Sequence, residues 1–239
     1  MKDRNADDWE ELARREPYFP VLTSDGIRED AFLETGEADI ALLLSAIGSI
    51  LGREILLTSA LDFGCGAGRL TLPLARRATR VVACDIAPTI LEHARRNADE
   101  AGLRNVTFIE TAALTGLCDR QFDFVCSLLV FEHIRPAEGY ALVRTLLRVL
   151  GPGGIAALQL TFEPPGGGAQ RLARMLSRSR PAHRVLRRNI PLPSYMQVNA
   201  YDERVINRAI AAAGASVIER FSTQRGDTSG TVLVIQKGS

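Results

Sequence analysis

The sequence predicts an α/β protein built on one doubly wound, mostly parallel sheet with helices on both faces. Short apolar runs typical of strands alternate with helical stretches from Ile55 to Phe162, and this alternation indicates βαβ units. Runs such as VVAC and FVCSLLV are apolar almost throughout, which is typical of parallel strands buried on both faces. A length of 239 residues suits one such domain with additions better than two independent domains.

The individual elements follow from local apolar patterns, taken in chain order. A helix is expected over Asp30–Leu51, where apolar residues recur at helical spacing. Seven strands are expected after it: Ile55–Phe63, Arg80–Cys84, Asn105–Ile109, Phe122–Ser127, Ile155–Phe162, Ser216–Phe221 and Thr231–Gln236. The helices expected between them are a stretch through Leu70, Leu74 and Ala75, then Pro88–Ala101, Gly139–Leu150 and Tyr201–Ala213.

Proline, glycine and acidic residues mark several ends of these elements. Pro88 suits the first turn of a helix, and Gly151-Pro152-Gly153-Gly154 is expected to stop the helix before the fifth strand. Asp202 is expected to cap the last helix or to stand in its first turn. The last two strands, joined by Ser222–Gly230, predict an antiparallel pair, so that the sheet ends in an antiparallel edge strand.

The composition excludes several classes of protein. With 29 basic and 28 acidic residues the net charge is +1, which indicates no polyanion-binding surface and argues against nucleic acid as a partner. The longest charge-free apolar stretch, Ile40–Leu51, has 12 residues, whereas a bilayer span needs about 20, so no transmembrane segment is expected. The four cysteines form no CxxC pair and no metal-ligand spacing with histidines, so neither a metal site nor a disulfide framework is expected. We therefore expect a protein of the reducing cytoplasm.

A glycine-rich turn joins the first expected strand to the helix after it, in the run LDFGCGAG. Glycines at such a turn let backbone amides approach a ligand closely, and the N-terminus of the following helix favours negative charge. Asp85 follows Gly66 by 19 positions, at the end of the second expected strand. A carboxylate at about this separation accepts hydrogen bonds from the two hydroxyls of a ribose. The strand, turn, helix, second strand and terminal acid together predict a nucleoside site.

The spacing of the glycines separates two kinds of nucleoside site. Dinucleotide sites read G-x-G-x-x-G, whereas this turn reads Gly64-x-Gly66-x-Gly68 and follows Asp62, which suits a cationic amino group better than a pyrophosphate. In these residues the chain resembles the class I S-adenosylmethionine-dependent methyltransferases that act on small molecules, which have a Rossmann-like sheet. The resemblance covers about residues 60–162 and also includes the acid in VVACDIAP, the strand FDFVCSLLVFEHI and the turn LLRVLGPGG.

The resemblance implies S-adenosylmethionine as the cofactor and assigns its contacts residue by residue. Asp62 and the turn from Gly64 to Gly68, with Cys65 inside it, would hold the methionine part. Asp85 would bind the ribose hydroxyls, and Ile86 would pack on the adenine.

Two further parts of the chain complete the implied cofactor site. Ala112 aligns with a position where an acid often faces the adenine amino group, so its backbone would serve there, with Glu110 or Thr111 as substitutes. Ser127 and Leu128 would lie beside the reacting methyl group. The expected cofactor-binding residues are Asp62, Gly64, Cys65, Gly66, Gly68, Asp85, Ile86, Ala112, Ser127 and Leu128.

A histidine follows the fourth expected strand, where open α/β sheets bind ligands. The sulfonium methyl is already activated, so the protein mainly aligns the acceptor and excludes water. A hydroxyl acceptor also benefits from a base, and we expect His133 in the run FEHI to be that catalytic base. The alternative is a structural role, in which His133 only hydrogen-bonds the backbone and shapes its loop.

The expected domain organisation is one domain in four parts. Residues 1–52 would form an N-terminal helical arm or lid, and residues 53–162 the cofactor-binding core. Residues 163–200 would form a basic insert on the substrate side, and residues 201–239 a helix and strand pair that completes the sheet. The arm contains three aromatic residues, Trp9, Tyr18 and Phe19. They either close over the cofactor as a lid or only pack the arm against the core.

The basic insert follows a hinge signal at Pro164–Gly168 and carries seven arginines and no acid over residues 171–188. Arg184 and Arg187 are the candidates for binding a phosphate or carboxylate of the acceptor. A membrane-facing flap for a lipid-linked acceptor is the second interpretation. A solvated helix face or a contact between two copies of the chain, as in a homodimer, is the third.

The function that the sequence predicts is methyl transfer to a small molecule, most readily to a hydroxyl oxygen. The fourth strand ends in Ser127-Leu128-Leu129-Val130 and not in the Asn/Asp-Pro-Pro-aromatic turn of nucleic-acid amino methyltransferases, nor is there a Pro-Cys nucleophile. Transfer to nitrogen or carbon, a catalytically silent cofactor-binding domain, and a nicotinamide-dependent oxidoreductase remain the alternatives. A thermal shift with NAD(P)H but not with S-adenosylhomocysteine would favour the last of them.

Overall fold

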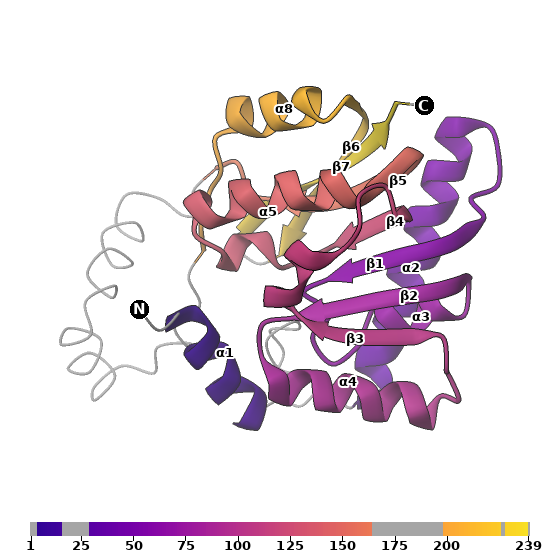
Figure 1. Cartoon of the computed structure of the whole chain (residues 1–239), viewed down its shortest axis with the longest axis vertical. Helices are drawn as coiled ribbons and strands as arrows, with labels where there is room; N and C mark the ends of the chain where they lie inside the picture. The colour runs from indigo at the N-terminus through magenta and orange to yellow at the C-terminus, as the bar shows by residue number, and fades with distance from the viewer. Residues whose placement is uncertain (1–3, 16–28, 164–197, 226–227, 239) are drawn as a thin grey trace.

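A seven-stranded sheet forms the centre of the computed structural model, which describes residues 4–15, 29–163, 198–225 and 228–238 (Figure 1). The strand order is β3-β2-β1-β4-β5-β7-β6, and every neighbouring pair up to β5 is parallel. β7 runs antiparallel to both of its neighbours, so β6 forms the edge. The strands are β1 Leu57–Phe63, β2 Ala78–Asp85, β3 Val106–Glu110, β4 Phe122–Ser127, β5 Leu150–Leu160, β6 Ala215–Arg225 and β7 Thr228–Lys237.

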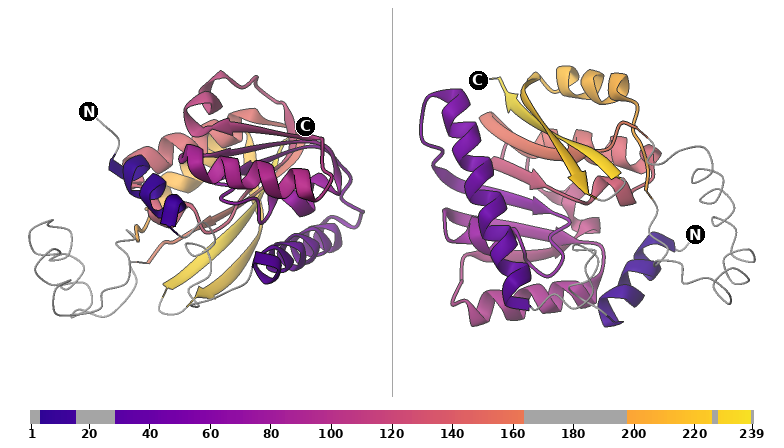
Figure 2. Two further views of the ribbon diagram at one scale, coloured as in Figure 1. Left: turned by 90° about the horizontal axis from the view of Figure 1, so that it is seen from below. Right: turned by 180° about the vertical axis from the view of Figure 1, so that it is seen from behind.

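Helices cover both faces of this sheet, as predicted for a doubly wound, Rossmann-like fold. The α-helices of the described residues are α1 Arg4–Arg15, α2 Glu29–Leu51, α3 Thr71–Ala75, α4 Pro88–Glu100, α5 Pro136–Val149 and α8 Glu203–Ala212. α5 and α8 pack on one face, whereas α2, α3 and α4 pack on the other, where α2 crosses the strands and lies in front of them in the right-hand view of Figure 2. Short 3-10 turns follow β3 and β4, at η2 Thr111–Gly116 and η3 Phe131–His133.

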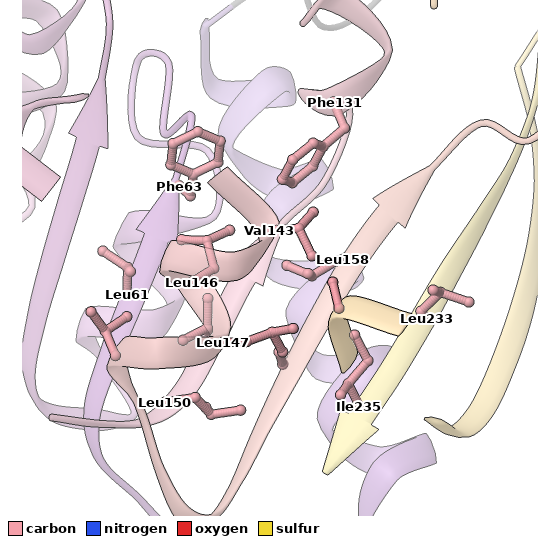
Figure 3. Close-up of a cluster of buried hydrophobic side chains, with 14 of the residues drawn as sticks. Leu61, Phe63, Phe131, Val143, Leu146, Leu147, Leu150, Leu158, Leu233 and Ile235 are labelled. Atoms are coloured by element: carbon pink, nitrogen blue, oxygen red, sulfur yellow. The ribbon is translucent and has the colours of Figure 1, made fainter. Parts of the chain in front are cut away.

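The larger core lies between the sheet and the pair α5 and α8. Alternate strand residues point toward it, as the two-residue period of a strand requires, and side chains of α5 fill the space between them (Figure 3). At one end of this core the rings of Phe63 and Phe131 lie 5.7 Å apart between centroids. The fully buried members include Leu61, Phe131, Val143, Leu146, Leu147, Leu158, Leu233 and Ile235.

On the opposite face, the long helix α2 approaches the chain just after the glycine turn. A Cβ atom at Gly36 of α2 would lie only 1.8 Å from the carbonyl oxygen of Arg69, so only glycine fits. Ile40 and Ile47 of the same helix are fully buried in the second core. The predicted helix over Asp30–Leu51 is therefore confirmed, and it braces the segment that leaves the glycine turn.

The largest differences from the predicted boundaries lie in the last three strands, β5, β6 and β7, whereas most other ends differ by one to three residues. The run Gly151–Gly154 does not lie outside a strand, because β5 already begins at Leu150 and pairs there with Phe122 of β4, across a register shift. β6 and β7 also extend further, since Arg225 and Thr228 still pair across the segment predicted as a long connection. The Asp202 cap is confirmed, because its carboxylate accepts a hydrogen bond from the Arg204 N–H over 2.8 Å.

The order of the strands singles out the carboxyl ends of β1 and β4. The chain leaves β1 toward β2 on one side and returns to β4 on the other, which makes this edge the switch point where open α/β sheets bind ligands. None of the helices in the described part of the chain has the length and apolar character that a bilayer span requires.

Candidate active site

The glycine turn after β1 has a backbone conformation that requires glycine. Gly64, Gly66 and Gly68 have φ of 75°, 54° and 95°, in the region that residues with a Cβ rarely adopt. The amides of Gly64 and Cys65 both donate to the carbonyl oxygen of Cys84 in β2, over 2.8 and 3.0 Å. The turn is therefore held against the end of the neighbouring strand.

The three glycines differ in what a side chain would meet. A Cβ at Gly64 would lie 2.4 Å from Cγ2 of Val130, and one at Gly68 would lie 2.8 Å from Cδ1 of Leu72. At Gly66 no heavy atom lies within 4 Å of the Cβ position. Two of the glycines therefore permit close packing inside the protein, and Gly66 leaves a free approach to the backbone from outside.

Asp85, at the end of β2, is tied directly to the glycine turn. Its Oδ2 accepts the Gly66 N–H over 2.9 Å, and its Oδ1 accepts the Ala87 N–H over 3.1 Å. Burial raises the pKa of this carboxyl group, and hydrogen bonds from backbone amides work in the opposite direction. A carboxylate has about four acceptor positions, so Asp85 keeps capacity for hydroxyl donors while it holds the turn.

Asp62, at the penultimate position of β1, is almost completely buried, with 1% of its surface exposed. Its Oδ2 accepts a hydrogen bond from Oγ1 of Thr71 over 2.6 Å, and burial raises its pKa from 3.8 to about 6. The guanidinium of Arg69 favours the ionised form of Asp62, but it forms its ion pair with Asp39 of α2. The site thus contains a buried carboxylate with no ion pair of its own in the described residues, which suits a cationic ligand group.

The segment after β4 closes over the glycine turn. Ser127, expected beside the reacting methyl, is fully buried and donates its hydroxyl to the Phe63 carbonyl oxygen over 3.0 Å. Leu128 is half-buried, and Val130 packs against Gly64. Leu129 between them has a φ of 63°. The structure therefore brings this segment to the glycine turn, and direct contact of Ser127 and Leu128 with the cofactor stays a prediction.

His133 lies at the end of η3, with 9% of its surface exposed. Its Nε2 lies 3.4 Å from Oε1 of Glu132, and its ring meets the edge of the Trp9 indole at a centroid distance of 5.3 Å. The Val130 carbonyl oxygen accepts the His133 backbone N–H over 2.9 Å. A carboxylate and an aromatic ring therefore both lie against the imidazole and limit its orientation.

The loop that carries His133 is fixed by a segment almost 70 residues later. The Tyr201 hydroxyl lies 2.9 Å from the Phe131 carbonyl oxygen and 2.8 Å from that of Ile134. Burial raises the pKa of the Tyr201 phenol, so it stays protonated and can donate. The Asn199 N–H donates to the Glu132 carbonyl oxygen over 2.7 Å.

Helix α1 lies beside α4 at the edge to which the arrowheads of β1 to β4 point (Figure 1). Trp9 packs with Ala67 of the glycine turn and with Ala87 and Ile90 beyond Asp85. The carboxylate of Glu10 accepts the Thr89 N–H over 3.1 Å and also accepts the Thr89 hydroxyl. α1 therefore contacts the glycine turn, the acid turn and His133 together.

The remaining predicted site residues are of two kinds: some lie in the described part of the structure, and others fall outside it. Ile86 is half-buried after Asp85, and Ala112 is exposed on η2. The thiol of Cys65 has a pKa raised by burial, as have those of Cys84 and Cys126, and all three are unbridged. Arg184, Arg187, Tyr18 and Phe19 fall outside the described residues.

The sequence did not reveal four contributors to this site. Thr71 holds Asp62, Arg69 joins the turn to α2, Tyr201 fixes the His133 loop, and Gln159 accepts the Leu129 N–H over 3.1 Å. The position of Thr71 nine residues after Asp62, in the first turn of the following helix, is a signal that could have found it. The others depend on contacts between distant parts of the chain.

A polar cavity of about 390 Å³ lies further along the same edge of the sheet, between the end of β5 and the strands β6 and β7. Phe162, Glu203, Arg220 and Thr223 are among its lining residues. None of the predicted site residues in the described part of the chain lines it, so it is separate from the candidate site at the carboxyl ends of β1 and β4.

Comparison with known proteins identifies the central part of the chain. Residues 60–154 match a family model described as a methyltransferase domain. Two curated relatives, both ubiquinone biosynthesis O-methyltransferases, are 44% identical over 98 residues (from Methylocella silvestris) and 38% identical over 94 residues (from a Methylobacterium species). These matches cover 40% and 39% of this chain, and the chain spans only 36% and 37% of the length of those relatives.

Solved structures extend the likeness to the whole fold. A magnesium protoporphyrin IX methyltransferase from Synechocystis with bound S-adenosylmethionine superposes with a TM-score of 0.64 at 18% identity, over 100% of this chain and 99% of the other. An N-methyltransferase from Bradyrhizobium japonicum with bound S-adenosylhomocysteine gives 0.65 at 15% identity, over 99% and 100%. The predicted fold is confirmed, and the predicted resemblance to methyltransferases is confirmed for residues 60–154.

Proposed function

We propose that this chain, whose residues 60–154 match a methyltransferase domain, transfers a methyl group from S-adenosylmethionine to a hydroxyl oxygen of a small molecule. The observation that carries the proposal is the arrangement of three groups at the carboxyl ends of β1 and β2. The space at the Cβ position of Gly66 is open, Asp85 accepts the Gly66 N–H, and the buried Asp62 lies near the end of β1, just before the turn.

The residues present fit S-adenosylmethionine. The open space at the Cβ position of Gly66 lets the methionine part approach the backbone of the turn closely, and the carboxylate of Asp62 matches its ammonium group. Asp85 has acceptor positions for the ribose hydroxyls, and the half-buried Ile86 offers an apolar surface to the adenine. When bound, the cofactor supplies a methyl group already activated by a sulfonium, so the protein needs to position the acceptor and to exclude water.

In this proposal His133 accepts the proton of the acceptor hydroxyl. The Glu132 carboxylate, 3.4 Å from the imidazole, orients the ring, as carboxylates do beside catalytic histidines. Trp9 covers the ring from the side of α1 and keeps water from it. An oxygen acceptor agrees with the names of the curated relatives, which match over 40% of this chain or less.

The remaining expectations on the organisation of the chain enter as proposals. Residues 4–15 act as a lid, because α1 touches the glycine turn, the acid turn and His133. Arg184 and Arg187 bind an acidic group of the acceptor, which is a free anionic or a lipid-linked molecule. The reducing cytoplasm is the proposed compartment, in line with unbridged cysteines at Cys65, Cys84, Cys118 and Cys126.

Calorimetry with S-adenosylhomocysteine tests the cofactor site. We expect the wild-type chain to bind and the Asp85→Ala chain to lose at least about 100-fold in affinity, because two hydrogen bonds to a charged acceptor are removed. Asp99→Ala changes an exposed acid of α4 and serves as the control, with unchanged affinity. Absence of binding to the well-folded wild-type chain, or equal affinity of the Asp85→Ala chain, would contradict the proposal.

A screen of metabolites with a labelled methyl donor then tests the reaction and identifies the acceptor. With that acceptor, His133→Ala should slow methyl transfer about 100-fold and leave the affinity for S-adenosylhomocysteine within about threefold. Turnover that is undiminished across the pH range would remove His133 as the base. Labelling of an amine or a carbon in place of a hydroxyl would replace the oxygen acceptor in the proposal.

A further inference from the structure

The turn after β4 contains a strained residue. Leu129 has a φ of 63°, and among the described residues the only other non-glycine residue with a positive φ is Arg120. Leucine disfavours this conformation because its Cβ approaches the following carbonyl oxygen. A leucine stays in it only where the surrounding structure holds it there.

One side chain supplies that hold. Oε1 of Gln159, in β5, accepts the Leu129 N–H over 3.1 Å. On its other side, Nε2 of Gln159 donates to Oγ1 of Thr223 in β6 over 3.1 Å. The first bond fixes which way the amide points, because the Leu129 N–H can only donate and needs the oxygen, so the nitrogen must face Thr223, whose hydroxyl oxygen can accept.

The path of this side chain requires a glycine. β7 lies between β5 and β6, so Gln159 must pass over β7 to reach Thr223. The residue that pairs with Thr223 on β7 is Gly230, where a Cβ would lie 2.9 Å from Nε2 of Gln159 and 2.8 Å from Oγ1 of Thr223. Gly230 therefore leaves room for a hydrogen-bonded bridge across three strands.

The bridge ends at the candidate active site. Leu129 stands between Leu128, assigned beside the reacting methyl, and Val130, whose methyl groups press on Gly64 of the cofactor turn. A change of conformation at Leu129 would move both neighbours. We propose that Gln159 is a positioning residue for methyl transfer, which sets the turn Leu128–Val130 against the cofactor site; this inference rests on the proposed function.

Two substitutions separate the hydrogen bond from the shape of the side chain. Gln159→Met keeps the length but loses the acceptor, whereas Gln159→Glu keeps an acceptor for the Leu129 N–H and accepts from the Thr223 hydroxyl. Gln236→Met, at the far end of the same strand pair, is the matched control. Amide hydrogen exchange at residues 128–131, affinity for S-adenosylhomocysteine, and kcat and KM for the acceptor found in the screen are measured for each chain.

The expected result is a loss in Gln159→Met that Gln159→Glu largely restores. In Gln159→Met the Leu129 amide should exchange at least about tenfold faster and kcat should fall about tenfold, with KM for the acceptor within about twofold. Adding Leu129→Asn to Gln159→Met should recover part of kcat, because asparagine adopts the left-handed conformation more readily. Gln236→Met should match the wild type in all of these measurements.

Several outcomes would overturn the inference. Unchanged exchange at Leu129 in Gln159→Met would show that the bond does not hold the turn. Unchanged kcat, or losses in Gln159→Met and Gln159→Glu that follow only a lower melting temperature, would reduce Gln159 to a structural role. A wild-type chain that binds no S-adenosylhomocysteine refutes the proposed function itself, and the exchange arm then still decides whether Gln159 holds Leu129.

Discussion

The buried carboxylate of Asp62 makes the stability of the ligand-free chain depend on pH. Asp62→Asn removes the charge and keeps an oxygen that accepts the hydrogen bond of Thr71. A carboxyl pKa raised from 3.8 to about 6 means that the folded chain binds the proton more tightly than the unfolded chain. The contribution of Asp62 to the free energy of unfolding therefore decreases as pH rises from about 4 to about 6. Above that range this contribution does not change with pH. The difference between the two pKa values corresponds to about 3 kcal/mol.

Thermal unfolding of the ligand-free wild-type and Asp62→Asn chains between pH 4.5 and 8 measures this effect. At pH 8 we expect the variant to be more stable by about 3 kcal/mol, which raises the melting temperature by about 6–12 °C in a chain of this size. The difference should shrink as pH falls below about 6, because the wild-type carboxyl becomes neutral. Asp99→Asn, at an exposed position of α4, is the control and should leave the profile unchanged.

The same substitution should weaken cofactor binding, because the ammonium group of S-adenosylhomocysteine loses its carboxylate partner. In the wild type the affinity should fall about tenfold between pH 7 and pH 5, as Asp62 takes up its proton. Asp85 also has a raised pKa, so Asp62→Asn should retain a weaker pH dependence. A variant that is less stable than the wild type at pH 8 and binds S-adenosylhomocysteine equally well would refute this reasoning.

Three further substitutions test other contacts. Gly64→Ala should lower affinity for S-adenosylhomocysteine at least about tenfold by calorimetry, and Val130→Ala should restore part of it, because the new Cβ would lie 2.4 Å from Val130. Gly139→Ala should reduce the free energy of unfolding in urea by about 2 kcal/mol, since its Cβ would lie 2.2 Å from the Tyr201 hydroxyl; an unchanged midpoint would contradict this packing. Trp9→Ala should increase the dissociation rate of S-adenosylhomocysteine about threefold in stopped-flow measurements, and an unchanged rate would count against α1 as a lid.

Most of the sheet could be predicted from the sequence because its strands are short, apolar and separated by helices. Phe122–Ser127 was predicted to the residue as β4. The start of β5 was missed because the glycines of Gly151–Gly154 look like a turn, although Leu150 pairs with Phe122. Strand ends depend on partners far away in the chain, and a local pattern does not contain them.

The cofactor half of the site was also accessible, since Asp62, the glycine turn and Asp85 lie within 24 residues of one another. Their order and spacing are enough to indicate a nucleoside-binding site. The supporting contacts were not accessible: the carbonyl oxygens held by Tyr201 are about 70 residues away, and Leu129 and Gln159 are 30 apart. Ser127 is a further example of what the sequence does not contain. Its position near the site was expected, but its hydroxyl donates to the Phe63 carbonyl oxygen, a contact that the sequence did not predict.

The close approach of Gly36 to Arg69 has a consequence for the smallest fragment that can work. Residues 60–154 carry the family match, yet the helix that contains Gly36 and Asp39 ends before that stretch begins. Cutting the chain at residue 60 would remove Asp39, the ion-pair partner of Arg69, the apolar side chains that α2 packs in the second core, and the start of β1. The part of the chain that matches the family is therefore shorter than the part that must fold together. Helix α2, which ends at Leu51, is as necessary to the structure of the glycine turn as the glycines are.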